Sequence, residues 1–239
     1  MDDQCLAVHR TIVALDVEGF GARQRTNRNQ LAVRDGLYRA LHEAFQRAGI
    51  PWDDHEDRGD GVFILVGPEV PKSLLVETLP SALVSALCEH NGAHPNAEQI
   101  RLRMALHGGE VNYDAYGATG ASINLTFRLL ECDSIKRALA SSSGVLAVIV
   151  SSWFFEEVVR HSTVDNATYF PVLVTVKETS AKGWICLPDQ VGRRAHVALE
   201  RLSAFQQTSL WRRTLGEIPD DPHSVPRCCV WHICSSALR

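Results

Sequence analysis

Long apolar segments are missing from this sequence of 239 residues. No run approaches the roughly 18 uninterrupted apolar residues that a membrane-spanning helix requires, so we expect no membrane association. Residues 1–4 are acidic and lack the basic and apolar regions of a secretory signal peptide. The seven cysteines are odd in number and scattered, which favours reduced thiols over a disulfide framework. We therefore expect a cytoplasmic protein.

An excess of basic charge is missing too. The 24 Lys and Arg residues are outnumbered by 28 Asp and Glu residues, which gives a formal net charge of −4. A general nucleic-acid binder needs a basic surface for its phosphate contacts, so this class of function is excluded. A single nucleotide is not excluded, because a bound metal ion can reverse the field inside an acidic site.

Apolar periodicity predicts alternating strands and helices. Short β-branched apolar runs are typical of buried strands, and apolar residues recurring every three or four positions are typical of helices. We expect Pro80 either to kink one helix or to start a new segment after a short first turn. We also expect residues 107–109 to interrupt a strand and residues 116–120 to form a loop. The expected strands are 11–17, 62–66, 100–106, 110–113, 145–150, 172–176 and 184–187, and the expected helices are 29–48, 73–90, 121–140 and 151–160.

The order of these elements indicates the fold class. Its first part matches the βαββαβ pattern of the ferredoxin-like fold, so we expect an α+β protein with such a core. The composition changes after Asp189, where prolines and a cysteine-rich end follow. We therefore predict one domain over residues 1–189 and an appendage of unknown role over residues 190–239.

Two carboxylates stand where a metal site would need them. Asp16 ends the first expected strand, and Asp60 lies at the tip of the hairpin that leads into residues 62–66. Paired carboxylates suit Mg²⁺, which proteins usually hold with one or two carboxylates plus substrate phosphates. The backbone amides of residues 18–21, opening onto a helix, could then bind a phosphate. Taken alone, each carboxylate is better explained as an ordinary turn residue, so the argument depends on their combination with other motifs.

Several short motifs occur together with these carboxylates. The chain resembles the class III nucleotide cyclases over roughly residues 8–188. Each motif is weak by itself, and their common order and spacing make the resemblance specific. The matching stretches are residues 15–20 (LDVEGF), 58–63 (RGDGVF), 104–111 (MALHGGEV), 120–129 (GASINLTFRL) and 176–177 (VK).

The resemblance implies an activity and a metal site. In that family the 3′-hydroxyl of a nucleoside triphosphate attacks the α-phosphate, which releases pyrophosphate and a 3′,5′-cyclic monophosphate. By this match Asp16, Val17 and Asp60 hold two Mg²⁺ or Mn²⁺ ions in a two-metal displacement. Gly19 and Phe20 belong to the loop that would bind the substrate phosphates.

The resemblance also implies roles for three further residues. Asn124 would orient the ribose, Arg128 would neutralise charge on the α-phosphate, and Lys177 would bind the distal phosphates. Asn124 and Arg128 are four residues apart, so one helix face presents both. In the family these groups face the metal carboxylates across a dimer interface, which implies a homodimer with two composite sites.

The chain departs from the family at the residues that read the base. Purine cyclases use a lysine where this chain has Glu56, and an Asp or Cys where it has Gly117. Glu56 reverses the charge and Gly117 has no side chain, so adenine reading is lost. Arg58, Tyr113 and Tyr116 are the candidates that would fill the pocket around a smaller base.

Loss of purine reading makes the chain similar to the bacterial pyrimidine cyclases of the Pycsar anti-phage systems. This similarity implies that UTP or CTP is converted into cyclic UMP or cyclic CMP, which switches on a co-encoded effector. Glu56 also keeps GTP open, because guanylate cyclases use a glutamate there. An adenylate or guanylate cyclase with an atypical base pocket is thus one alternative, and an inactive nucleotide-binding module is another. The chain keeps both Asp residues and the Asn–Arg pair, which argues against the inactive module.

One histidine and four residues near the C-terminal end have side chains that could act in catalysis or bind a metal, but their sequence context indicates neither role. His107, at the end of an expected strand, is better explained by packing or by hydrogen bonding to the backbone than as a general base. Four residues near the C-terminal end have zinc-donor atoms, but their spacing fits no common structural zinc site. They are Cys228, Cys229, His232 and Cys234.

Overall fold

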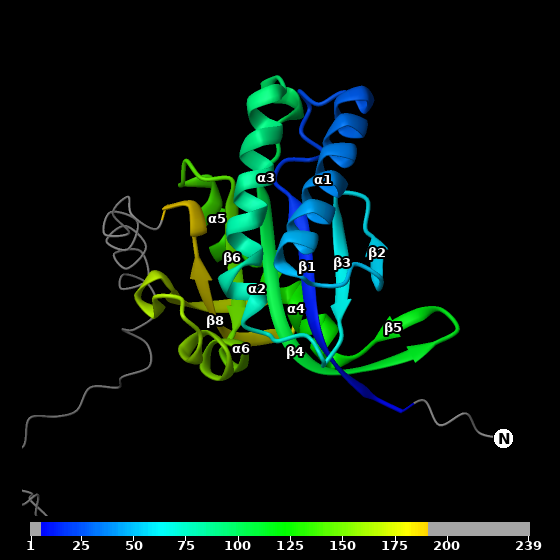
Figure 1. The fold of residues 1–239 in the computed structure, drawn as a ribbon, viewed down its shortest axis with the longest axis vertical. Coiled ribbons are helices and arrows are strands. Elements are labelled where there is room, and N and C mark those ends of the chain that lie inside the picture. Colours follow the sequence, from blue (N-terminus) through cyan, green and yellow to red (C-terminus); the bar gives the residue numbers. More distant parts are fainter. Residues whose placement is uncertain (1–5, 191–239) are drawn as a thin grey trace, which may run out of the picture. The chain divides into compact units, whose positions relative to one another are not determined.

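The computed structural model describes residues 6–190, which fold around one mixed β-sheet (Figure 1). The sheet has eight strands, seven of them in the order β2-β3-β1-β4-β6-β8-β7, and β5 pairs with β4. The strands are β1 Val8–Val17, β2 His55–Asp57, β3 Gly61–Val66, β4 Leu102–Asp114, β5 Gly117–Thr119, β6 Leu146–Ser151, β7 Phe170–Val176 and β8 Thr179–Cys186. The helices are α1 Asn27–Ala48, α2 Leu74–Glu77, α3 Leu79–Ala93, α4 Ala121–Glu131, α5 Asp133–Ala140 and α6 Ser152–Glu157.

The first part of the chain forms the expected ferredoxin-like core. β1 pairs antiparallel with β3 on one side and with β4 on the other, and β2 pairs antiparallel with β3. This gives the strand order of a βαββαβ unit, with α1 and α3 as its two helices. The predicted α+β class is therefore confirmed. Residues 191–239, which hold the candidate zinc donors, lie outside the described residues.

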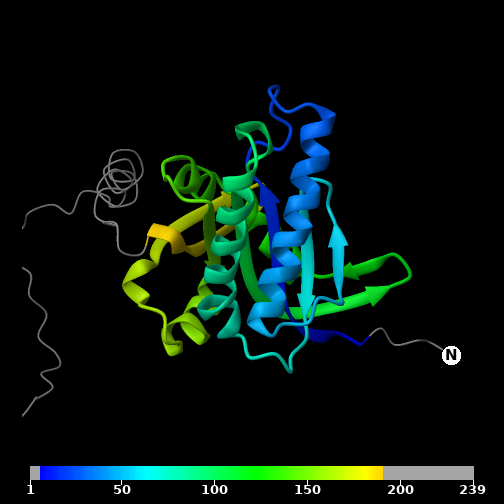
Figure 2. The same cartoon turned by 45° about the horizontal axis from the view of Figure 1, so that its top comes forward.

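Alternation along the strands divides the core between the two faces of the sheet. On β1, Val13, Leu15 and Val17 belong to the large cluster that includes α1 and α3. Ile12 and Ala14 point to the other face, where clusters built with α4 and α5 lie. Figures 1 and 2 show α1 and α3 side by side on one face, with α4 behind the sheet. Asp16 continues the Ile12–Ala14 series and so lies on the α4 face.

Helix α1 begins and ends as its sequence indicates. Thr26 forms a capping box with Asn29, in which the Thr26 hydroxyl accepts the Asn29 amide and the Asn29 side chain accepts the Thr26 amide. Gly49 ends the helix in the left-handed conformation that favours glycine. Pro80 lies in the first turn of α3, directly after the break that separates α2 from α3. The predicted helix end at residue 48 is confirmed, and at Pro80 the structure shows a new helix after a short first one.

The expected interruption of β4 at residues 107–109 is wrong. β4 runs unbroken to Asp114, with Gly108 and Gly109 paired opposite β1. These glycines provide room, because a Cβ on Gly108 would meet the Trp153 ring and a Cβ on Gly109 would meet the Ser122 side chain. Glycine inside this strand therefore marks close packing rather than a turn.

Two further expectations about local structure need correction. The helix predicted over 121–140 is two helices, because Cys132 has an extended backbone and α5 starts anew at Asp133. The loop predicted over 116–120 contains β5, which folds back on β4 as a hairpin that extends away from the sheet in Figure 1. Among the described residues, no helix is both long enough and apolar enough to cross a membrane.

Candidate active site

Strand pairing brings the two candidate metal carboxylates together. Asp16, near the end of β1, pairs with Gly61 at the start of β3, so Asp60 lies beside it in the register. The Val17 amide donates to the Asp60 carbonyl at 2.8 Å, which ties the β2–β3 turn to the end of β1. A Cβ on Gly61 would collide with the Leu15 backbone, so this close approach requires glycine.

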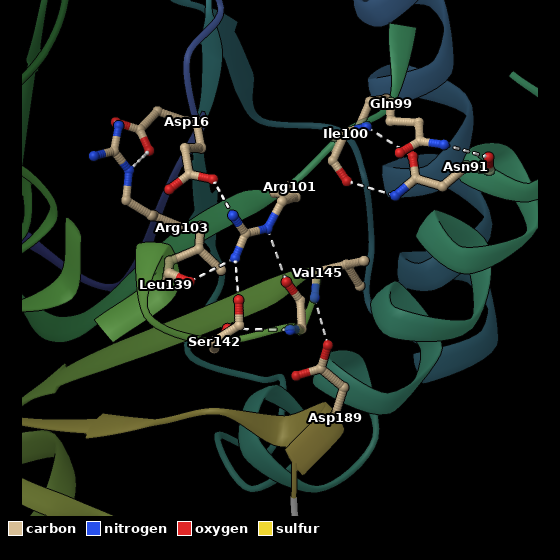
Figure 3. A network of polar contacts seen from close by, with 12 residues as sticks. Asp16, Asn91, Gln99, Ile100, Arg101, Arg103, Leu139, Ser142, Val145 and Asp189 are labelled. Carbon is tan, nitrogen blue, oxygen red and sulfur yellow. Dashed lines mark hydrogen bonds and ion pairs between the residues drawn. The ribbon is translucent and has the colours of Figure 1, made fainter. Parts of the chain in front are cut away.

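The Asp16 carboxylate is held by an arginine from the neighbouring strand. Arg103 on β4 donates from Nε and Nη2 to the two Asp16 oxygens at 2.7 and 2.8 Å (Figure 3). The Arg103 and Asp16 side chains are only 13% and 20% exposed. Burial raises the pKa of Asp16 above its ordinary value, the Arg103 charge opposes this rise, and the Asp60 charge adds to it. The two carboxylates therefore repel one another, which is the condition that a cation between them would relieve.

These donors fit a magnesium or manganese site. Carboxylate and carbonyl oxygens are the ligands that both ions prefer, and Asp16, Asp60 and the Val17 carbonyl supply them. Asp16 keeps lone pairs beyond the two that Arg103 uses. Across residues 6–190 no group of three or more His, Cys, Asp or Glu side chains gathers as a metal cluster. Two ions would therefore complete their shells with substrate phosphate oxygens and water.

A second arginine fixes the loop that follows β1. Arg101 donates from Nη1 to Glu18 at 2.6 Å. Its other donors reach the carbonyls of Gly144, Leu139 and Ser142 between α5 and β6. Arg101 thereby anchors the start of the loop to the last turn of α5 and to the segment that leads into β6.

The phosphate cradle expected in residues 18–21 does not open onto a helix. The Glu18 amide donates to the Arg101 carbonyl at 2.9 Å, and the Phe20 amide donates to the Val17 carbonyl at 3.4 Å. Helix α1 starts only at Asn27, and Thr26 caps it. Gly19 is exposed, with a φ of 63°, whereas the Phe20 ring packs against the core under α1. The error came from reading the glycines as the start of the helix.

A pocket of about 200 Å³ lies on the α4 face of the sheet. It brings together three of the predicted site residues, Glu56, Arg58 and Asn124. Phe63 on β3 also lines it and pairs with Ala14, two register positions from the Asp16–Gly61 pair. Strand alternation therefore puts the pocket and Asp16 on the same face of the sheet. The remaining lining residues, which sequence analysis did not single out, are Ala118, Thr119, Gly120, Ile123 and Phe127.

The base-reading candidates lie as neighbours at this pocket. A Cβ on Gly117 would lie 3.2 Å from the Glu56 carboxylate, so the two predicted positions are adjacent. The Arg58 guanidinium lies 5.0 Å from the centre of the Phe127 ring, and its Nη1 lies 3.8 Å from Glu56. The Glu56 carboxylate and the Arg58 guanidinium thus lie side by side next to the apolar Phe127 ring. This arrangement suits a flat ligand that both donates and accepts hydrogen bonds.

The two tyrosines proposed to fill the pocket lie elsewhere. The Tyr113 hydroxyl donates to Asp54 at 2.8 Å and lies 3.3 Å from Arg10 Nε. Tyr116 is 98% exposed at the tip of the β4–β5 hairpin. Neither is among the lining residues of the described pocket, so of the three filling candidates only Arg58 reaches it.

Arg128 and Lys177 lie beside the pocket rather than in its lining. Arg128, on α4, is 16% exposed and bonds Glu131 at 3.3 Å and Glu178 at 3.2 Å. Glu178 stands in the β7–β8 turn next to Lys177, whose φ of 51° is unusual for a residue other than glycine. The turn therefore brings Lys177 to the end of α4 that carries Arg128, and an anionic ligand of Arg128 would compete with two carboxylates.

His107 is buried within the fold. Its Nδ1 lies 2.8 Å from the Ser151 hydroxyl, and the Trp153 ring meets its edge. Burial, together with the charge of His9, lowers the pKa of His107 to about 4. The prediction that this residue serves packing and hydrogen bonding is confirmed, with a side-chain rather than a backbone partner.

Known structures share this fold at low sequence identity. The guanylyl cyclase Cya2 aligns with a TM-score of 0.56 and 18% identity over 75% of this chain and 91% of that chain. The adenylate/guanylate cyclase/hydrolase from Silicibacter pomeroyi gives 0.54 and 18% over 77% and 99%. The adenylyl cyclase CyaB from P. aeruginosa gives 0.54 and 12% over 75% and 94%.

The other comparisons are negative. No protein-family model matches the chain, and a search of curated proteins finds no match. The structural likeness is therefore a likeness of fold, and it extends over nearly the whole of each cyclase domain compared. The described part of this chain has the fold of adenylyl and guanylyl cyclase catalytic domains.

Proposed function

We propose that this protein is a nucleotide cyclase that converts a nucleoside triphosphate into its 3′,5′-cyclic monophosphate and pyrophosphate. One observation carries the proposal. Asp16 lies on the same sheet face as the pocket that contains Asn124, two register positions from the lining residue Phe63, and Asp60 adjoins Gly61, the β3 partner of Asp16. Metal-ligand chemistry and a pocket of about 200 Å³ thus occur together in a fold that cyclases share.

The reaction forms a bond between O3′ of the ribose and the α-phosphorus while the bond to pyrophosphate breaks. Divalent ions held by Asp16 and Asp60 would supply Lewis-acid stabilisation of the phosphate charge and acidify the 3′-hydroxyl. Asn124 would hold the ribose through its amide, and Arg128 would donate to the α-phosphate oxygens as their charge grows. Lys177 would bind the departing pyrophosphate, whose charge an ammonium group matches.

We infer that two copies of the chain form each active site. The support is that the described pocket includes Glu56, Arg58 and Asn124 but neither Asp16 nor Asp60. In a symmetric dimer the pocket of one protomer would face the carboxylates of its partner, and the arrangement would occur twice. Mixing Asp60→Ala with Asn124→Ala protein tests this, because heterodimers would regain one intact site. Activity that does not recover on mixing would contradict it.

We propose a pyrimidine base, UTP or CTP, as the preferred substrate. Glu56 and the absent side chain at Gly117 remove the adenine-reading pair. Arg58, stacked over Phe127, narrows the pocket and can donate to a base carbonyl. The Glu56 carboxylate can accept a hydrogen bond from the ring or the exocyclic nitrogen of a pyrimidine. Arg58 and Glu56 together match the mixed donor and acceptor edge of uracil or cytosine.

GTP is the second candidate, and Glu56 favours it. A carboxylate can accept both N–H groups on the Watson–Crick edge of guanine. The Glu56 carboxylate lies in the pocket lining, where such an edge would meet it. Arg58 distinguishes the two candidates, because a purine needs the space that its guanidinium occupies over Phe127.

The deciding experiment incubates the full chain with each of the four nucleoside triphosphates and Mn²⁺. Chromatography with mass detection then identifies any cyclic product. We expect cyclic UMP or cyclic CMP as the main product and its loss in Asp60→Ala protein that remains folded. Cyclic GMP or cyclic AMP as the main product would contradict the pyrimidine assignment, and unchanged turnover by Asp60→Ala would contradict the metal assignment. A cyclic-nucleotide-activated effector and an anti-phage role stay predictions from the resemblance.

A further inference from the structure

The turn between β2 and β3 serves both halves of the proposed site. Glu56 and Arg58 line the pocket, and Asp60 stands beside Asp16. The turn itself has little packing, since residues 57–60 are exposed. Gly59 adopts a φ of 85°, which the left-handed region allows to glycine at little cost. Such a turn holds its side chains in place only if polar contacts from elsewhere fix its backbone.

An arginine on α1 provides these contacts. Arg34 donates from Nη1 and Nη2 to the two Asp57 oxygens, at 3.0 and 2.5 Å, and Nη1 also donates to the Gly59 carbonyl. Asp57 in turn accepts the Gly59 amide at 2.9 Å. The Arg34 guanidinium and the Gly59 amide hold the pKa of the Asp57 carboxyl well below its usual range. Four hydrogen bonds therefore link Arg34, Asp57 and Gly59 in a ring that joins helix α1 to the first part of the turn.

Arg34 is itself well placed to act as a fixed point. Val33, which precedes Arg34, and Leu37, one turn later, are buried on the core-facing side of α1. The Arg34 guanidinium lies 5.9 Å from the centre of the Tyr38 ring. A planar guanidinium that binds a carboxylate at two points and stacks on a ring has few orientations left. Helix α1 therefore transmits its own rigidity to the turn.

We propose that Arg34 is a positioning residue that sets the β2–β3 turn and, through it, both Asp60 and Arg58. This inference rests on the proposed function. The far end of the turn is tied to β1 by the Val17 amide, which donates to the Asp60 carbonyl. Arg34 links the other end of the turn, at Asp57 and Gly59, to helix α1. Without it the turn keeps its β1 anchor, the bond from the Arg58 amide to the Gly61 carbonyl and the contact of Asp57 with Tyr38, but it loses the three hydrogen bonds that Arg34 donates to Asp57 and Gly59.

The expected effect is on function rather than on folding. Arg34→Ala removes an ion pair whose Asp57 partner is half exposed, and such pairs contribute little to stability. Losing a residue that orients metal ligands typically costs about 10- to 100-fold in metal affinity or activity. We expect kcat/KM to fall by about 10- to 100-fold. We also expect the Mn²⁺ concentration for half-maximal activity to rise, with the melting temperature nearly unchanged.

The matched control is Arg39→Ala on the same helix. Arg39 pairs with Asp35 at 3.2 Å within α1, and its side chain is 65% exposed against 30% for Arg34, so the pair lies on the solvent side of the same helix. We expect this variant to behave as the wild type. Arg34→Lys keeps the charge but lacks the two-point fork, so we expect an intermediate value of kcat/KM. Arg34→Ala combined with Asp57→Ala should cost less than the sum of the two single variants, because both remove the same ion pair.

Two readouts do not depend on turnover. Hydrogen exchange of the Gly59 amide should be faster in Arg34→Ala than in Arg39→Ala, and Mn²⁺ titrated into the nucleotide-free protein should bind more weakly. Equal exchange and equal Mn²⁺ affinity in the two variants would overturn the inference. If no nucleotide is cyclised by the wild type, the proposed function fails, and these two measurements still decide the role of Arg34.

Discussion

Acid should weaken this fold through His107. The imidazole of this β4 residue is buried beside Ser151 on β6, and burial lowers its pKa to about 4. An unfolded histidine has a pKa of about 6.5, so between these values the unfolded chain binds a proton that the folded chain does not. The contribution of His107 to the free energy of unfolding is therefore fully present above pH 6.5 and is lost as the pH falls toward 4. The difference corresponds to about 3 kcal/mol in all, of which about 2 kcal/mol is lost between pH 7 and pH 5.

The variant His107→Gln isolates this contribution. Glutamine does not titrate and keeps a polar group near the Ser151 hydroxyl. Urea unfolding at pH 5, 6 and 7 gives the free energy of unfolding of each protein. The wild type should lose about 2 kcal/mol relative to the variant over this range. The exposed His42→Gln serves as the control and should follow the wild type. A wild-type minus His107→Gln difference that stays constant with pH would refute the reasoning.

Three further variants test the site. Gly61→Ala should lower the free energy of unfolding by about 1–3 kcal/mol and reduce activity, because a Cβ would push β3 away from the Leu15 backbone; urea unfolding and turnover both measure this. Arg103→Met should cost about 3 kcal/mol in the same unfolding assay, since it leaves Asp16 buried without its partner, and wild-type stability would contradict that. Glu178→Gln should lower KM for the nucleotide by about twofold to fivefold, because Arg128 then has one competing carboxylate fewer, and an unchanged or raised KM would count against it.

The strands and helices were predictable where local patterns decide structure. Residues 11–17 read as a strand and extend into β1, and the helix predicted at 29–48 is α1 with two residues added at its start. The capping residue Thr26 and the stop at Gly49 act within a few residues of the helix they bound, so the sequence alone contains them. The same is true of the α+β class, since it follows from the order of elements.

Errors arose where a residue's meaning depends on distant partners. Gly108 and Gly109 indicate a turn in isolation, yet Trp153 and Ser122 pack against them and keep β4 intact. The Glu18 amide was expected to be available to a phosphate, yet it donates to the carbonyl of Arg101, which lies more than eighty residues away in sequence. No local pattern can report such a contact.

The candidate site also has features that the sequence predicts and features that depend on tertiary contacts. The sequence by itself determined the fold class, the order of elements and the residue types of the candidate chemistry, because these depend on periodicity and short motifs. Only the tertiary structure decided that Glu56, Arg58 and Asn124 share one pocket and that Asp16 stands two register positions from it. It also decided that Arg34 grips the turn bearing Asp60. The physical reason is that strand register and helix packing, which local sequence does not encode, set which distant side chains meet.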